Sequence, residues 1–124
     1  NPLYYVQYAH ARICSILRQA SEQGDFNIEN CNYELLTDEY SVELLKNLAY
    51  FPEIVAQAAT NYEPHRICNY LQILASSFHK FYNNNKVITE DKEQTESYLA
   101  LITAVKITLR NALELIGVSA PEKM

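Results

Sequence analysis

Two tyrosines and an arginine lie at helical spacing near the start of the chain: Tyr5, Tyr8 and Arg12. Residues three and four apart share one side of a helix, so these side chains are expected to form a stripe beside its apolar face. A tyrosine ring next to a guanidinium can stack on an unpaired nucleic-acid base and hydrogen-bond to its edge. The alternative interpretation is that the rings only border the core and keep their hydroxyls in water.

Side chains that could bind phosphate are few, because the 124-residue chain has 10 Lys and Arg against 15 Asp and Glu, a formal net charge of -5. Phosphate binding depends on lysine and arginine, so this balance argues against a basic surface over the whole molecule. The charges are unevenly placed, however. Acidic residues crowd positions 22–53, whereas positions 64–87 have no carboxylate and carry Arg66, Lys80 and Lys86. The acidic stretch is either solvated surface or a face that docks a protein partner.

The sequence shows no pattern typical of a catalytic or metal site. Cys14, Cys31 and Cys68 are odd in number and irregularly spaced, which favours reduced thiols in a cytosolic protein. His10 with Cys14, and His65 with Cys68, have spacings that a helical metal site can use, but no Cys-x-x-Cys or His-x3-His pair accompanies them. There is no glycine-rich phosphate loop and no triad spacing. We therefore expect no catalytic residue, metal or cofactor in this chain.

The elements that position these residues are predicted to be helices. Apolar residues repeat at intervals of three and four, which predicts an all-α antiparallel bundle of four main helices, the second broken near Pro52. The first helix is expected over residues 2–22, with Asn1 as its N-cap and Gly24 just beyond its end. After a polar loop, the second helix is expected to begin at Thr37 or Asp38. The predicted buried stripes are Val6, Ala9, Ile13, Ile16 and Ala20 in the first helix and Val42, Leu45, Leu48 and Ala49 in the second.

The third helix is expected to start at Glu63-Pro64 and to end at residues 83–85, because proline suits a first turn and asparagine favours caps. The fourth is expected over residues 90–116, with Gly117 beyond it. Its apolar surface is wide, so we expect it to be the central helix. The predicted core residues are Ile67, Leu71, Leu74, Phe78 and Phe81 in the third helix, and Tyr98, Leu99, Leu101, Ile102, Val105, Leu109, Ala112, Leu113, Leu115 and Ile116 in the fourth.

The length bounds the organisation of the chain. At 124 residues it is expected to form one domain with one core. No apolar run reaches the ~18 residues of a transmembrane helix, and residues 1–20 do not have the pattern of a signal peptide. The chain does not begin with methionine, so we expect it to be a piece of a longer protein.

Three segments resemble a known family in its own order. They are Asn1-Pro2-Leu3-Tyr4-Tyr5-Val6-Gln7-Tyr8-Ala9-His10-Ala11-Arg12, the segment from Glu63-Pro64-His65-Arg66 to Phe78-His79-Lys80-Phe81-Tyr82-Asn83, and the end of the chain from Thr108 to Ala120-Pro121-Glu122-Lys123-Met124. The chain resembles the C-terminal anticodon-binding domain of class I arginyl-tRNA synthetases. Lys123 stands where many members have arginine, and residues 25–39 carry no family signal. Related domains occur in cysteinyl enzymes, but the two ends of the chain favour arginine.

The resemblance implies an all-α anticodon-recognition module, residues 1–124, of a longer cytoplasmic arginine–tRNA ligase. The parent would attach arginine to tRNA using ATP with Mg²⁺. Its catalytic motifs, His-x-Gly-His and a Lys-Met-Ser-Lys-like loop, are not in this sequence. The resemblance therefore implies an N-terminal catalytic domain in the same chain and an arginine-specific tRNA as partner, with no membrane. The alternative is a helical protein-interaction domain whose acidic stretch is the docking face and which makes no RNA contact.

The resemblance also implies where a base would bind. The family's pocket for the central anticodon cytidine lies between the first and third helices and the C-terminal end. Residue by residue, this implies base contacts from Tyr5, Tyr8, Tyr82 and Met124, and phosphate or sugar contacts from Arg12, Arg66, Lys80 and Lys86.

Structural alternatives exist for some of the polar side chains in these segments. Arg66 can pair with Glu63 or Tyr62, and Arg110 is expected to pair with Glu114 four residues later. His10 is as well suited to packing inside the protein as to a contact with RNA.

Overall fold

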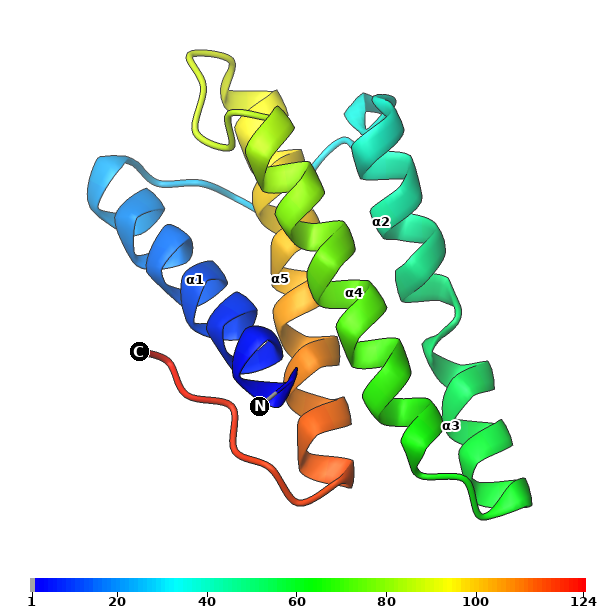
Figure 1. Cartoon of the computed structure of the whole chain (residues 1–124). Helices are drawn as coiled ribbons and strands as arrows, with labels where there is room; N and C mark the ends of the chain where they lie inside the picture. Colours follow the sequence, from blue (N-terminus) through cyan, green and yellow to red (C-terminus); the bar gives the residue numbers. More distant parts are fainter. Residues whose placement is uncertain (1) are drawn as a thin grey trace.

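The computed structural model describes residues 2–124, and within that range every regular element is helical. The elements are α1 (Pro2–Gln23), the short 3-10 helix η1 (Tyr33–Leu35), α2 (Glu39–Ala49), α3 (Phe51–Asn61), α4 (His65–Asn84) and α5 (Lys92–Leu115). Successive main helices run in opposite directions, with α2 and α3 together forming the second (Figure 1). The all-α prediction is confirmed. The predicted N-cap of the first helix, Asn1, lies outside the described residues.

Local chemistry explains where the helices begin and end. The Asp38 carboxylate caps α2 by accepting from the backbone N–H of Ser41 at 3.1 Å and from its hydroxyl at 2.7 Å. Pro52 stands in the first turn of α3, where its missing N–H costs no helical hydrogen bond. Gly117 follows α5 with φ +75°, a conformation that favours glycine. The predicted break at Pro52 and the predicted end before Gly117 are therefore confirmed.

The core lies between α4 and the helices around it. α4 packs against each of the other α-helices, while α5 packs against α1, α2 and α4 and against η1. The central position predicted for the fourth main helix is therefore held by α4, because α3 turns back onto α4 rather than onto α5. The predicted stripes of α1 and α4 are buried as expected: Val6, Ala9, Ile13, Ile16 and Ala20, and Ile67, Leu71, Leu74, Phe78 and Phe81.

The predicted stripe of α2 is wrong at Val42, Leu45 and Ala49, whereas Leu48 packs partly buried against the core as expected. Val42 and Leu45 are exposed, at 37% and 39% of their surface, and the side that faces the bundle carries Ser41 and Leu44. Ser41 is tolerated on the buried side because its hydroxyl donates to the Asp38 carboxylate. Leu115 is also exposed rather than buried, because it ends α5 where the chain turns away.

After α5 the chain turns back along α1. In Figure 1 the red C-terminal tail leaves the lower end of α5 and runs beside α1, so that the end of the chain lies next to the first helix. Val118 and Ala120 of this tail pack partly buried against the core. Within residues 2–124, no helix combines the length and the apolar composition that a membrane crossing requires.

Candidate nucleic-acid interface

Three separate segments form one hollow: the middle of α1, the last turn of α4 and the end of the tail. Its volume is about 450 Å³. It brings together four of the residues predicted from the sequence as RNA contacts, which are Tyr8, Arg12, Tyr82 and Met124. It is also lined by Ala11, Ser15, Ile16, Arg18, Gln19, Glu122 and Lys123.

Arg12 links the two tyrosines of the hollow. Its Nη1 donates to the Tyr8 hydroxyl at 2.9 Å, and its guanidinium carbon lies 4.7 Å from the centre of the Tyr82 ring and 5.5 Å from that of Tyr8. Both distances are typical of cation–π contacts. The guanidinium is therefore held in place by groups that leave some of its five N–H donors unused, and these can meet a base edge or a phosphate.

Aromatic side chains of α4 pack against the two tyrosines of the hollow. Tyr82 stacks on Phe78 one turn earlier in α4, with ring centres 6.0 Å apart and planes inclined by 25°. Tyr8 stacks on His79 at 6.0 Å and 22°. Burial and the nearby Arg12 charge lower the pKa of His79, which favours a neutral ring under Tyr8. The ring positions are thus set by packing before any ligand arrives.

Backbone carbonyls of the tail hold Met124 at the hollow. The Gln7 amide donates to the Ser119 carbonyl at 2.9 Å, and His10 Nδ1 lies 2.8 Å from the Pro121 carbonyl oxygen. Arg18 reaches the Glu122 carbonyl at 3.4 Å. These contacts explain how a terminal residue lies in a defined place along α1.

Tyr5 and Lys80 lie elsewhere, in a groove between α2 and α4. They line it together with Glu43, Asn47 and Ile73. Lys80 and Tyr82 are two residues apart in α4, so their side chains point to nearly opposite sides of the helix. The ring of Tyr5 also contacts His79, with the ring centres 5.1 Å apart, so that Tyr5 and Tyr8 share this histidine.

Lys86 lies in a second hollow that adjoins the first. This hollow has a volume of about 650 Å³ and shares Ile16, Gln19 and Tyr82 with the first. Tyr82 therefore stands between the two hollows. Lys86 is exposed in the loop after α4.

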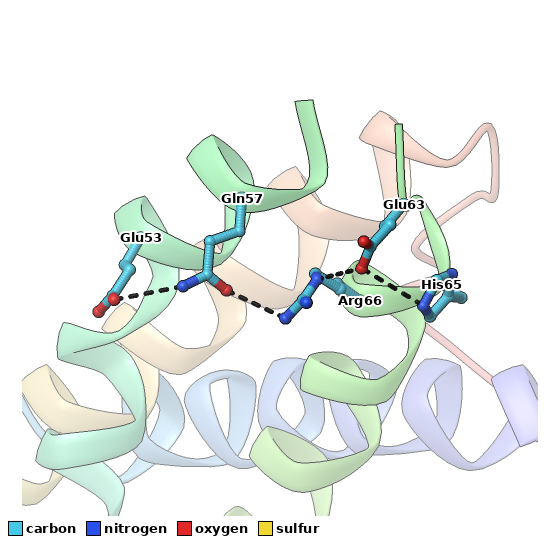
Figure 2. Close-up of polar contacts among 5 residues, drawn as sticks. All are labelled: Glu53, Gln57, Glu63, His65 and Arg66. Atoms are coloured by element: carbon cyan, nitrogen blue, oxygen red, sulfur yellow. Dashed lines mark hydrogen bonds and ion pairs between the residues drawn. The ribbon is translucent and has the colours of Figure 1, made fainter. Parts of the chain in front are cut away.

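Arg66 is remote from both hollows, at the start of α4. It lies sixteen residues before Tyr82 in the same helix, which is about 24 Å along the axis. Its guanidinium donates to the Glu63 carboxylate and, at 3.2 Å, to the Gln57 amide oxygen of α3. Figure 2 shows this network, which His65 joins through Glu63 and Glu53 through Gln57. The predicted pairing of Arg66 with Glu63 is confirmed.

Arg110 does not pair with Glu114 as predicted. Its Nη2 lies 3.8 Å from a carboxylate oxygen of Glu122 in the tail. The folded tail brings a second carboxylate beside α5, and sequence spacing within the helix cannot show that. This ion pair is partly exposed and adds a small contribution to holding the tail.

The basic side chains of the hollow lie apart from the acidic residues of α2. Arg12, Arg18 and Lys123 line the hollow together with one carboxylate side chain, that of Glu122. The acidic residues of α2 are on the far side of α4 from α1 (Figure 1). A chain of net charge -5 can therefore present a locally basic surface.

Sequence reasoning missed five polar residues of the hollow: Ser15, Arg18, Gln19, Glu122 and Lys123. Ser15 and Gln19 continue the stripe of Tyr8 and Arg12 at spacings of three and four, so the helical periodicity contained this signal. Arg18 and Lys123 meet only because the tail folds back along α1, and no local pattern shows that.

The cysteines and acids form no metal centre in the described part of the chain. Between Pro2 and Met124, no group of three or more His, Cys, Asp or Glu side chains is placed to hold an ion. The three cysteines are free, and burial raises the pKa of the Cys14 thiol.

The described residues form an all-α bundle in which two tyrosines and two arginines line one hollow. The comparisons with known proteins identify the family. Residues 6–124 match the DALR anticodon binding domain, and the chain belongs to this family.

Relatives that match the whole chain are arginine–tRNA ligases. The enzyme of Staphylococcus carnosus is 53% identical over 124 residues and that of Staphylococcus aureus is 55% identical. The chain spans 22% of the length of each of these relatives. Among solved structures, the arginyl-tRNA synthetase of Thermus thermophilus matches 97% of the chain with a TM-score of 0.79 and 36% identity, and the match covers 21% of that protein.

Proposed function

We propose that this chain is the anticodon-reading module of an arginine–tRNA ligase. The observation that carries the proposal is the convergence of Tyr8, Arg12, Tyr82 and Met124, from three segments, on one hollow. Its support is the family membership and the similarity to arginine–tRNA ligases over the whole chain. The parent protein would supply an N-terminal catalytic domain that joins arginine to tRNA with ATP and Mg²⁺.

The hollow suits a single unpaired base. A base can stack on the exposed part of Tyr8 or Tyr82, and such stacking contributes about 1–3 kcal/mol with little sequence preference. Discrimination needs polar groups in fixed positions, since a buried donor or acceptor without a partner costs about 1–3 kcal/mol. Arg12 provides such a group, and Met124 closes the hollow from the tail with Gln19 on its lining.

The remaining predicted residues would contact RNA outside the hollow. Lys86 would meet a phosphate or sugar next to the base on Tyr82, because its hollow shares that ring. Tyr5 and Lys80 would meet RNA along the groove beside α2. Arg66 would reach only RNA that extends about 24 Å along α4. Phosphate contacts from this few cations predict weak binding by the isolated chain, at about micromolar Kd or above.

The protein-interaction alternative has less support. The comparisons do not favour it, and the acidic side chains that it needs also have structural roles. Asp38, one of the carboxylates of the acidic stretch, is the N-cap of α2.

An NMR titration tests the proposal. The labelled chain is mixed at low salt with an arginine anticodon hairpin, or with the same hairpin whose central cytidine is replaced. Amide shifts at Tyr8, Arg12, Tyr82 and Met124 that occur only with the cytidine hairpin are expected. Equal shifts with both hairpins would show nonspecific contact, and the absence of shifts at millimolar RNA would refute the proposal.

A further inference from the structure

We infer that His10 is a positioning residue: its ring fixes the C-terminal tail and thereby holds Met124 at the hollow. The ring itself does not line the hollow. Its effect on RNA binding therefore rests on the proposed function, whereas its effect on the tail does not.

The geometry of His10 defines one contact to the tail. The side chain is completely buried, and Nδ1 lies 2.8 Å from the carbonyl oxygen of Pro121. A carbonyl oxygen only accepts, so Nδ1 must carry the proton. The other ring nitrogen, Nε2, is buried and has no hydrogen-bond partner within residues 2–124. The bond to Pro121 thus fixes the tautomer as well as the ring orientation.

The free-energy cost of burying the His10 ring indicates that this side chain does more than fill space in the core. A buried polar nitrogen without a partner destabilises the fold, and an apolar side chain would fill the space without that cost. What histidine adds at this position is the bond to Pro121. The neighbouring groups agree with a neutral ring: burial, with the charges of Arg110 and Lys106, lowers its pKa, although the Pro121 bond and Glu122 act in the opposite sense. The Cys14 thiol, 3.8 Å from Nδ1, also faces the ring.

The bond between His10 and the Pro121 carbonyl lies directly before the last three residues and sets the direction of the chain there. The ring of Pro121 restricts its own φ, so fixing the Pro121 carbonyl sets the direction in which Glu122, Lys123 and Met124 continue. The other side-chain contacts to the tail, from Gln7, Arg18 and Arg110, are exposed and compete with water. The bond from the buried His10 is better shielded from water, so we expect it to hold the tail when the exposed contacts open.

Two variants separate the bond from the volume of the side chain. His10→Asn keeps an N–H donor near the Nδ1 position, whereas His10→Leu removes the donor and keeps an apolar filling. His65→Leu, at an exposed histidine at the start of α4, is the matched control. Met124 is the only methionine in the sequence, so its ¹³C-methyl resonance is a single reporter of the tail.

We expect His10→Leu to move the Met124 methyl resonance to its free-peptide chemical shift and to narrow its line. Hairpin binding should weaken about five- to tenfold, because Met124 is then no longer held in place before the RNA binds. His10→Asn should restore much of the wild-type methyl chemical shift and of the hairpin affinity, and His65→Leu should match the wild type in both measurements. A Met124 methyl that stays unchanged in a folded His10→Leu variant would overturn the inference. If wild-type chain binds no hairpin, the proposed function fails while the methyl signal still tests the positioning role.

A measurement on the wild type avoids any folding defect of the variants. Long-range ¹⁵N–¹H correlation spectra of the imidazole identify which nitrogen of His10 is protonated. The Nδ1–H tautomer is expected, and an Nε2–H tautomer would overturn the inference because Nδ1 could then not donate to Pro121.

Discussion

At the scale of single residues, the hollow depends on side chains that hold one another. Arg12 bonds to the Tyr8 hydroxyl and lies over the Tyr82 ring, and Phe78 supports Tyr82 from within α4. Each contact is modest, but together they fix a guanidinium and two rings in the absence of RNA. This preorganisation reduces the entropy lost when a base binds.

Tyr82 is predicted to contribute through stacking. Tyr82→Ala should weaken hairpin binding by about 1–3 kcal/mol, roughly five- to 150-fold, without unfolding the chain. Filter binding at a stated salt concentration, with circular dichroism as the folding check, measures this. Tyr50→Ala, at an exposed tyrosine between α2 and α3, is the control. Normal affinity in Tyr82→Ala would remove this residue from the site.

The buried His10 and the partly buried His79 predict that acid destabilises the fold. Burial is the main cause that lowers the pKa of each ring. Below about pH 6.5 the unfolded chain therefore binds more protons, and the free energy of unfolding decreases as the pH falls towards the lowered pKa values. Urea unfolding at about pH 7.5 and 5.5 tests this. The decrease should be smaller in His10→Asn and unchanged in His65→Asn; an identical decrease in all three would contradict the role of His10.

At the scale of elements, the joints between helices carry the least regular backbone. Tyr62 ends α3 in the left-handed region, with φ 55° and ψ 44°, and its side chain is 91% exposed. Glu63, the next residue, anchors Arg66 and so ties this joint to α4. The corner between α3 and α4 is thus held by polar contacts around one strained residue.

Replacing Tyr62 with glycine should stabilise the chain. A left-handed conformation costs an ordinary residue about 1–2 kcal/mol, while glycine loses about 0.5–1 kcal/mol in unfolded-state entropy, so Tyr62→Gly should gain about 0.5–1 kcal/mol. The midpoint of urea unfolding measures the gain. Tyr50→Gly, where φ is -78°, should instead destabilise. A loss of stability in Tyr62→Gly would show that the tyrosine makes a favourable contact there.

Arg66 can be tested as a link between elements. Arg66→Ala removes the bonds to Glu63 and Gln57, and because the guanidinium is about 40% exposed the expected loss of unfolding free energy is below about 1 kcal/mol. Hairpin affinity measured on the same variant separates the two roles. Reduced affinity at preserved stability would support the predicted phosphate contact, and lower stability at preserved affinity would show a structural role alone.

At the scale of the whole molecule, the arrangement of helices separates charge. Cations gather where α1, α4 and the tail meet, and the carboxylates of α2 lie across α4 from them (Figure 1). Interactions between charges on the two sides of α4 are largely screened at physiological salt, where the Debye length is about 8 Å. The negative net charge therefore does not prevent local binding of phosphate.

Charge substitutions should show this separation. Arg18→Gln should weaken hairpin binding and reduce the slope of log affinity against log salt by up to about 0.7, the value for one phosphate contact on a single strand. Glu39→Gln, at an exposed carboxylate of α2 that lines neither hollow nor the groove of Tyr5 and Lys80, should change affinity less than about twofold at physiological salt. A large gain in affinity from Glu39→Gln would show that the acidic surface acts on the RNA directly.

The sequence alone determined the helices and most of their buried faces. The periodicity of α1 and α4, the start of α2 near Asp38, the break at Pro52 and the end before Gly117 are local features, because helical hydrogen bonds and caps join residues within about four positions. The stripe of Tyr8 and Arg12 was visible for the same reason. The sequence could not show which side of α2 is buried, since Val42 and Leu45 are as apolar as Leu44.

Only the tertiary structure decided which residues share the hollow. Tyr82 and Met124 meet Arg12 because α4 packs against α1 and the tail folds back over it, held at His10. The same packing separates Tyr5, Lys80 and Arg66 from that hollow and gives Arg110 a partner in the tail. The physical reason is that these contacts join residues up to about a hundred positions apart, and their partners depend on how helices pack rather than on spacing within one helix.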